Sequence, residues 1–496
     1  MILGFDSKLL KIAVHDICKS LTCLFNLLIK LGEIPKDWKL ARITPIYKGS
    51  GSRFEENNYR PISVICHISK ILEREIHGQF MSYLIQHNFV SIDQSAYMKY
   101  HSTHTCLHKV VDDWLENIDE GLITGLCLLD IRKCFDTIDH TLLLEKLNRY
   151  GVKGVELHWF KSYLNNRSQK VVCNNETSNT LDTDIGVPQG SILGPILFLV
   201  FINDLSQNIK SGQCNLYADD TLLYTSSKTI AEVADSLQKC LNEALIWYEN
   251  NNLCLNADKS KVMIISSNRN REASSLTSLN LDLDGIPLQT TNSAKYLGIF
   301  IDNHLTWERQ FSHICQLLGA KISRLRRLRK SVPSHILNTI CRTCLFPTFD
   351  YVCSVWGNAK VQHKRKVQRL QNYAARIVTN NFDYVNTRGE DLVRGLKWQT
   401  FNDRVNYFTA LLMFKCIHGL APHYLSDHIV MACEAHDKHT RLTNSFDVVV
   451  PSTQTSIYQQ SFMYNGAKTW NNLPEIVKES PNVSIFKYRY KKHVLA

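Results

Sequence analysis

The sequence predicts an α+β fold, with a sheet in the N-terminal part of the chain and helices in the rest. Two runs of apolar and β-branched residues, 125–129 and 262–265, are typical of buried strands. Between them, apolar residues recur every three or four positions from 230 to 248, which predicts a helix packed on one face of that sheet. Strand signals fade after about residue 308, so the chain beyond it is expected to be mostly helical.

The other elements can be placed in order along the chain. An amphipathic helix over 9–31 is expected to end at Gly32, and a helix over 142–150 at Gly151. Asn174 and Asn175 mark the turn of a predicted hairpin over 171–181. Further strands are expected at 43–48, 253–256 and 296–301, and further helices at 103–118, 196–202, 313–330, 333–343 and 364–378.

Composition places the chain among globular proteins. Its 496 residues, 44% apolar and 21% charged, have room for about two to four domains and exclude a disordered polypeptide. A formal net charge of +11 favours a polyanionic partner. Six of the ten residues at 321–330 are basic, which fits a solvated helix face, a localisation signal or a nucleic-acid contact.

The cysteines indicate an intracellular protein with reduced thiols, because the chain is long and shows no signal peptide. The longest apolar run, 192–202, is too short to span a bilayer, so no membrane partner is expected. Two spacings that could bind zinc are disfavoured. Cys341 and Cys344 are expected on a core helix face, and the spacing of Cys433, His436 and His439 fits no standard zinc finger.

The strongest candidate site is built from three carboxylates. Asp219 and Asp220 lie between two short apolar runs in residues 215–224, which predicts a hairpin with both in its turn. Asp130 follows the predicted strand 125–129, and neighbouring strands would bring all three to one sheet edge. A solvated turn is the plainer alternative. Clustered carboxylates repel unless cations neutralise them, and two Mg²⁺ ions about 3.5–4 Å apart can promote an in-line phosphoryl displacement.

Two other features could bind a phosphorylated substrate. Lys48 and Arg60 lie near flexible turns and are a plausible triphosphate clamp, although isolated surface charges are as common. Residues 186–195 contain three glycines and two prolines, which predicts a loop of fixed shape that backbone or ligand can approach closely. Phe135 could pack on a substrate sugar or fill the core.

Taken together and in this order, these stretches resemble the reverse transcriptases of non-LTR retrotransposons, most closely the jockey-like group. The similarity extends over nearly the whole chain. The motifs are Tyr-Arg-Pro-Ile-Ser at 59–63, residues 129–136, the loop 186–195, Tyr-Ala-Asp-Asp at 217–220, residues 256–259, Tyr-Leu-Gly at 296–298 and Trp-Asn-Asn-Leu-Pro at 470–474.

The resemblance implies a right-hand polymerase fold with fingers, a palm built on an antiparallel sheet, and a helical thumb. The implied domains are 1–110 for an N-terminal extension and fingers, 111–307 for the palm, 308–420 for a basic thumb and 421–496 for a mostly helical C-terminal region. Asp130, Asp219 and Asp220 would hold two Mg²⁺ ions, and Lys259 would act as the general acid.

The resemblance also implies the substrate contacts. Arg60 would touch the triphosphate, Phe135 would exclude the ribose 2′-hydroxyl, and Gln189 and Gly190 would line the nucleotide site. The partners implied are an RNA template, a DNA primer and deoxynucleoside triphosphates. An intracellular location, the nucleus with a cytoplasmic ribonucleoprotein stage, is expected for such an element.

The chain departs from the family pattern in three ways, two of them at particular residues. Cys134 replaces the usual alanine, and residues 96–103 differ from the usual fingers motif. We recognise neither an endonuclease nor a ribonuclease H pattern, so a target-nicking activity is expected in trans. Two alternatives remain: an intron maturase or telomerase-like enzyme, which would need large extra RNA-binding regions, and a non-catalytic nucleic-acid-binding remnant of the element.

Overall fold

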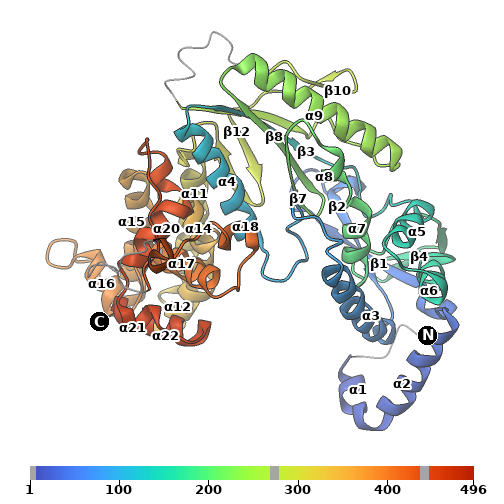
Figure 1. Ribbon diagram of the computed structural model, residues 1–496. Helices are drawn as coiled ribbons and strands as arrows, with labels where there is room; N and C mark the ends of the chain where they lie inside the picture. The colour runs from blue at the N-terminus through green and yellow to red at the C-terminus, as the bar shows by residue number, and fades with distance from the viewer. Residues whose placement is uncertain (1–6, 268–278, 436–445, 496) are drawn as a thin grey trace.

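The computed structural model describes residues 7–267, 279–435 and 446–495. The chain forms an arch, with a central sheet at the top between two arms (Figure 1). One arm contains the N-terminal helices and a second sheet, and the other contains the helices after residue 308. Among the described residues, no helix is long and apolar enough to cross a membrane. The zinc alternative at Cys433, His436 and His439 depends on two residues outside this described part.

The central sheet, here called the palm sheet, has the strand order β7-β8-β3-β9, and every pair is antiparallel. On one face, helices α7 (Gly194–Ile202) and α9 (Ile230–Asn250) share a core with the strands, and α4 (Thr103–Asp119) covers the other face. Both faces are therefore buried, and only the strand ends are available to a site. The strands are β3 (Ile123–Leu129), β7 (Gln213–Tyr217), β8 (Asp220–Ser227) and β9 (Lys261–Ile265).

The second sheet, here called the fingers sheet, joins strands from two separate parts of the chain. β1 (Leu40–Tyr47) pairs antiparallel with β2 (Tyr59–Val64) and parallel with β4 (Arg167–Cys173). Residues 167–183 are thus paired with the N-terminal part, although the predicted boundaries place them in the palm. The remaining elements here are α1 (Ser7–Ile12), α2 (Val14–Leu31), α3 (His67–Gln86), α5 (His140–Arg149), α6 (Gly154–Leu164), β5 (Glu176–Thr177) and β6 (Leu181–Thr183). The short helix α8 (Leu205–Asn208) instead contacts α9 and β7 of the palm.

A separate hairpin follows the palm sheet. β12 (Ser293–Tyr296) and β13 (Ile299–Asp302) are joined by Leu297 and Gly298, both with positive φ, as a two-residue turn of this kind requires. The Tyr351 hydroxyl donates to the Leu297 carbonyl at 2.8 Å and so ties the turn to the helical arm. Two shorter strands, β10 (Asp282–Leu283) and β11 (Ile286–Pro287), form another hairpin.

The helical arm has two cores. Helices from α11 to the start of α17 share a core with α4 and the outer palm-sheet face, whereas the rest of α17 and the later helices bury a core of their own. The helices are α11 (Glu308–Leu328), α12 (Ser334–Ile340), α13 (Phe346–Asp350), α14 (Cys353–Trp356), α15 (Val361–Thr379), α16 (Gly389–Gly395), α17 (Phe401–Ile417), α18 (His423–Ser426), α19 (Ala432–Ala435), α20 (Phe462–Asn471), α21 (Glu475–Lys478) and α22 (Val483–Leu495).

Helix α4 connects the palm sheet to the C-terminal helices through buried polar contacts. The Asp112 carboxylate accepts hydrogen bonds from the backbone N–H groups of Phe462 at 2.8 Å and Met463 at 3.1 Å, where α20 begins. Two turns further along α4, Asp119 accepts from the backbone N–H and the hydroxyl of Thr455, each at 2.6 Å. The C-terminal region is therefore fixed to the palm.

Most predicted elements are confirmed, including the helix end at Gly32 and the turn at Asn174 and Asn175. The strand predicted at 253–256 is wrong, because this segment makes only a single bridge between Leu255 and Ile131. The helix predicted over 9–31 is interrupted at Ala13.

Two further expectations concern the cysteine pair Cys341 and Cys344 and the aromatic residues of the last helix, α22 (Val483–Leu495). Cys341 is buried, which agrees with a core position, whereas Cys344 is exposed. The aromatic and basic residues that alternate at 486–492 suggest either stacking on unpaired bases or a surface helix. In α22, however, Phe486 and Tyr490 are buried in the C-terminal core, so these two side chains cannot stack on bases.

Candidate active site

Three aspartates meet at one end of the palm sheet. Strand β3 lies beside β8, and the pair Leu129–Thr221 puts Asp130 next to Asp220. Tyr217 pairs with Asp220, so Ala218 and Asp219 form the two-residue turn and Asp220 begins β8. The prediction of adjacent strands is confirmed, with one refinement: only Asp219 lies in the turn itself. We call these three residues the aspartate cluster.

The aspartate cluster carries closely spaced negative charge. Asp219 and Asp220 are exposed, and the Asp130 side chain is 43% exposed. Desolvation by the surrounding protein, and then the charges of Asp219 and Asp130, raise the pKa of Asp220 to about 6. Such repulsion is relieved by a bound cation, and carboxylate oxygens suit Mg²⁺. Within the described residues, no three His, Cys, Asp or Glu side chains are already arranged to hold a metal ion.

Asp130 is held by the loop that precedes β9. The Asn256 side-chain amide donates to Asp130 Oδ2 at 3.1 Å, and the Asn256 backbone N–H donates to the Asp130 carbonyl at 2.8 Å. The Ser260 hydroxyl accepts from the Asp130 N–H at 3.2 Å. Lys259 Nζ lies 3.9 Å from Asp130 Oδ2, so the structure brings the predicted general acid to the aspartate cluster. The sequence motif pointed to this loop but not to the supporting roles of Asn256 and Ser260.

Two neutral side chains lie near Asp219. Burial, and then the Asp219 charge, raise the pKa of the Tyr97 hydroxyl and of the Cys134 thiol above their ordinary values. Both groups therefore remain protonated at neutral pH. Cys134, which replaces the usual alanine, is accommodated as a small buried side chain.

The glycine-rich loop bridges the palm and the fingers sheet. Gln189 Nε2 donates to Asp136 Oδ1 at 2.9 Å, while the Gln189 carbonyl accepts from the Ser63 N–H of β2 at 2.7 Å. Gly190 has a φ of +122°, and a Cβ there would lie 2.6 Å from the Ser63 carbonyl oxygen. The predicted need for glycine is thus explained by close backbone approach. The predicted contact of Gln189 and Gly190 with a nucleotide stays a prediction.

Glu73 anchors the end of this loop. Its side chain is 1% exposed, and its Oε2 accepts from the backbone N–H groups of Ile192 at 2.8 Å and Leu193 at 3.3 Å. Burial raises the pKa of Glu73, although these hydrogen bonds oppose the shift. Glu73 has no signal in the sequence, because a lone glutamate in a helix resembles a surface residue.

Phe135 and Arg60 occupy different environments. Phe135 is half-buried and stacks on Phe198, with ring centroids 4.7 Å apart, so it contributes to the core whether or not it also meets a sugar. Arg60 is exposed on β2, opposite Ile46. The Lys48 backbone continues the same ladder of strand hydrogen bonds, and its side-chain Nζ donates to the Asn57 carbonyl at 2.7 Å. Arg60 therefore lies on the fingers sheet, whereas the aspartate cluster lies on the palm sheet.

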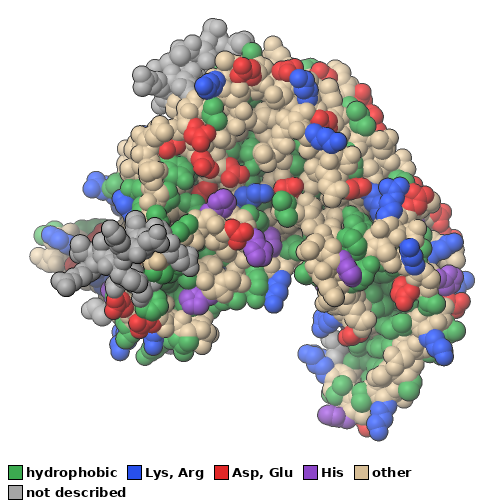
Figure 2. Space-filling view, viewed as in Figure 1, with side chains coloured by type: hydrophobic (Ala, Val, Ile, Leu, Met, Phe, Trp, Pro, Cys, Tyr) green, Lys and Arg blue, Asp and Glu red, His purple; other side chains and the backbone are tan. Residues whose placement is uncertain are grey.

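The surface between the two arms is hollowed below the palm, and His, Lys and Arg side chains are visible along its upper border (Figure 2). On the helical arm, most basic residues of the run at 321–330 are exposed, while Ile322 and Leu325 on the same helix are buried. Helix α15 likewise exposes Arg365, Lys366 and Arg369. These helices can offer cations to a phosphate backbone.

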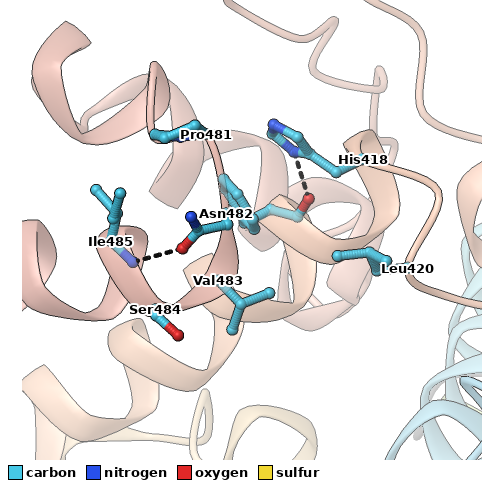
Figure 3. A pocket seen from close by; sticks show the side chains of 8 residues that line it. His418, Leu420, Pro481, Asn482, Val483, Ser484 and Ile485 are labelled. Carbon is cyan, nitrogen blue, oxygen red and sulfur yellow. Dashed lines mark hydrogen bonds between the residues drawn. The ribbon is translucent and has the colours of Figure 1, made fainter.

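A shallow pocket in the C-terminal region lies apart from this chemistry (Figure 3). It is lined by the end of α17 and the start of α22, including Phe414, His418 and Val483. His418 Nδ1 and the Phe414 carbonyl are 2.8 Å apart, and Asn482 caps Ile485 at 3.0 Å.

Comparison with known proteins gives a consistent result. Residues 46–301 match the family described as reverse transcriptase (RNA-dependent DNA polymerase). The chain is 30% identical over 393 residues to the probable RNA-directed DNA polymerase from transposon X-element of Drosophila melanogaster, covering 78% of this chain and 42% of that protein. It is 29% identical to the RNA-directed DNA polymerase from mobile element jockey of the same species, covering 81% and 44%. The chain thus spans less than half the length of these relatives.

Among solved structures, telomerase from Candida albicans in complex with a fragment of telomeric RNA is 14% identical, with a TM-score of 0.35, over 74% of this chain and 63% of that one. Telomerase from Candida tropicalis in a similar complex is 10% identical, with a TM-score of 0.39, over 77% and 68%.

Proposed function

This chain belongs to the reverse transcriptase (RNA-dependent DNA polymerase) family, and from that premise we propose that it extends a DNA primer on an RNA template as the polymerase of a non-LTR retrotransposon. The observation that carries the proposal is the aspartate cluster, in which the end of β3 meets the turn between β7 and β8. The substrates would be deoxynucleoside triphosphates, and the reaction would be attack of the primer 3′-oxygen on the α-phosphate.

We propose that Asp130, Asp219 and Asp220 hold divalent metal, two Mg²⁺ ions in the working enzyme. When bound, the ions would neutralise charge on the attacking and leaving oxygens. The raised pKa of Asp220 supports this role, because desolvation and then the charges of Asp219 and Asp130 disfavour its ionised form, which a bound cation would stabilise. Asn256 and Ser260 would keep Asp130 in place as charge develops.

Other residues would position the substrates. Lys259 lies beside Asp130 and is a suitable proton donor to departing pyrophosphate. Gln189 is fixed between Asp136 and β2, so it can line a nucleotide site that both sheets share. Phe135 would present its edge to the sugar, and Arg60 would approach the triphosphate from the fingers sheet.

The template–primer duplex would lie in the hollow between the arms. The helical arm exposes cations on α11 and α15 that are available to phosphates, and phosphate contacts position a duplex without reading its sequence. Binding should therefore weaken steeply as salt concentration rises.

Primer extension on poly(rA)/oligo(dT) with Mg²⁺ tests the proposal. We expect wild type to extend the primer and the double variant Asp219→Asn plus Asp220→Asn to lose extension while still binding the duplex. Fluorescence anisotropy of a labelled duplex measures that binding separately. A folded wild type that binds but never extends would refute the polymerase proposal and favour a binding remnant of the element.

A further inference from the structure

The outer edge of the catalytic hairpin is covered by a short segment from the fingers side of the chain. β7 is the edge strand of the palm sheet, and Gln94 bridges Leu216 in parallel. The Leu216 N–H donates to the Asp93 carbonyl at 2.9 Å, and the Ser95 N–H donates to the Leu216 carbonyl at 2.9 Å. Residues 93–95 thus act as one more strand beside the hairpin, opposite β3.

Gln94 also reaches the turn with its side chain. Its Oε1 accepts from the backbone N–H groups of Ala96 at 2.8 Å and Ala218 at 3.3 Å. Because both partners are donors, the atom between them must be the amide oxygen, which fixes the orientation of the side chain. Gln94 is 1% exposed, so water does not compete for these contacts.

The contact falls on a residue with an unfavourable backbone conformation. Ala218 has a φ of +54°, and for a residue other than glycine such a conformation is unfavourable and persists only when its surroundings hold it. Asp219 follows directly, so the direction of its side chain depends on that conformation. A hydrogen bond to the Ala218 N–H is well placed to maintain it.

We propose that Gln94 is a positioning residue: its amide oxygen holds the Ala218–Asp219 turn so that Asp219 faces Asp130 and Asp220. The inference rests on the proposed polymerase function for its kinetic consequences but not for its structural ones. Gln94 touches no reacting atom and acts only through the turn.

The same segment is fixed on its other side by the C-terminal region. The Ser95 hydroxyl lies 3.3 Å from the Tyr424 hydroxyl, and Tyr424 donates to Thr105 Oγ1 at 3.2 Å. Lys109 Nζ lies 3.6 Å from Asp93 and 5.4 Å above the Tyr424 ring. The support of the turn therefore continues from Gln94 through Ser95 to α18, which gives the C-terminal region an indirect role in placing Asp219.

Three variants test Gln94. Gln94→Met keeps the size but removes the acceptor, whereas Gln94→Glu keeps an acceptor oxygen. Gln371→Met is the matched control, because Gln371 is also 1% exposed and donates to a backbone carbonyl, that of Gln399 at 2.8 Å, far from the aspartate cluster in sequence. Hydrogen exchange of the peptide spanning 213–222 measures the turn without requiring activity.

For Gln94→Met we expect faster exchange in that peptide, a kcat about 10- to 100-fold lower and a higher Mg²⁺ requirement, since small misplacements of reacting groups have effects of this size. The KM for nucleotide and the Kd for duplex should stay near wild type. Gln94→Glu should restore exchange protection, and Gln371→Met should change neither exchange at 213–222 nor the Mg²⁺ requirement.

Unchanged exchange and kcat in Gln94→Met would overturn the proposal. The proposal would also be overturned if the loss of kcat in Gln94→Met and in Gln371→Met followed only the fall in melting temperature of each variant. If wild type has no polymerase activity, the proposed function fails, but the exchange comparison still decides whether Gln94 holds the turn.

Discussion

Asp112→Ala should loosen the C-terminal region from the palm. Asp112 is 8% exposed on α4, and it accepts the first two backbone N–H groups of α20. The alanine variant leaves both groups without an acceptor in a buried place, and each such group costs about 1–3 kcal/mol, so a loss of about 2–6 kcal/mol is expected. Helix initiation at α20 would then depend on Ser461 alone, whose hydroxyl accepts from Tyr464 at 3.2 Å.

The loss should depend on pH with a definite sign. Burial, and then the neighbouring charges of Asp113 and Glu116, raise the pKa of Asp112 from 3.8 to about 7, against the two hydrogen bonds that lower it. An acid with a raised pKa binds more protons in the folded state, so the free energy of unfolding falls as pH rises between those values. The full shift corresponds to roughly 4 kcal/mol. Asp112→Ala should therefore destabilise more at pH 5 than at pH 8.

Thermal unfolding at both pH values, with hydrogen exchange over residues 446–495, measures this effect. Glu249→Ala is the control, because Glu249 is an exposed acid in a helix, α9, and its charge is not among those that raise the pKa of Asp112. A larger destabilisation by Asp112→Ala at pH 8 than at pH 5 would refute the reasoning. It would mean that the ionised carboxylate is the stabilising partner of the α20 N-terminus.

Three further variants address the site itself. Gly190→Ala should lower primer extension by about 10- to 100-fold, because its Cβ would lie 2.6 Å from the Ser63 carbonyl and displace the loop from β2; a wild-type rate would contradict this. Lys259→Ala should reduce kcat by about 100-fold, as expected for loss of a general acid, while the exposed Lys261→Ala stays near wild type. Phe135→Val should raise incorporation of ribonucleotides about tenfold or more, measured by competing ribo- and deoxynucleotides; unchanged selectivity would remove Phe135 from sugar discrimination.

The chain order and strand patterns sufficed to predict the aspartate cluster. The apolar run before Asp130 predicted a buried strand, and the short runs around Asp219 predicted a hairpin. Their adjacency followed only conditionally, because the sequence does not fix which strands pair. The register that places Leu129 beside Thr221 depends on how both faces of the sheet are buried.

The supporting residues could not be predicted in the same way. Glu73, Gln94 and Asp112 are polar residues in stretches where polar side chains usually face solvent, and only tertiary packing buries them. By contrast, the burial of Phe486 and Tyr490 had a usable signal. Residues four apart on a helix share one face, so both could have been expected in a core.

Three of the polar residues that support the aspartate cluster and its neighbouring loop share one physical task. A site of clustered like charges is intrinsically unfavourable, so the backbone that carries it must be held from outside. Gln94 holds the hairpin turn, Asn256 holds Asp130, and Glu73 holds the loop that reaches β2. Gln94 and Glu73 do so with side-chain oxygens that accept from backbone N–H groups, whereas Asn256 donates its side-chain amide to the Asp130 carboxylate and its backbone N–H to the Asp130 carbonyl. The rigidity required at the strand ends is thus supplied by three separate segments of chain.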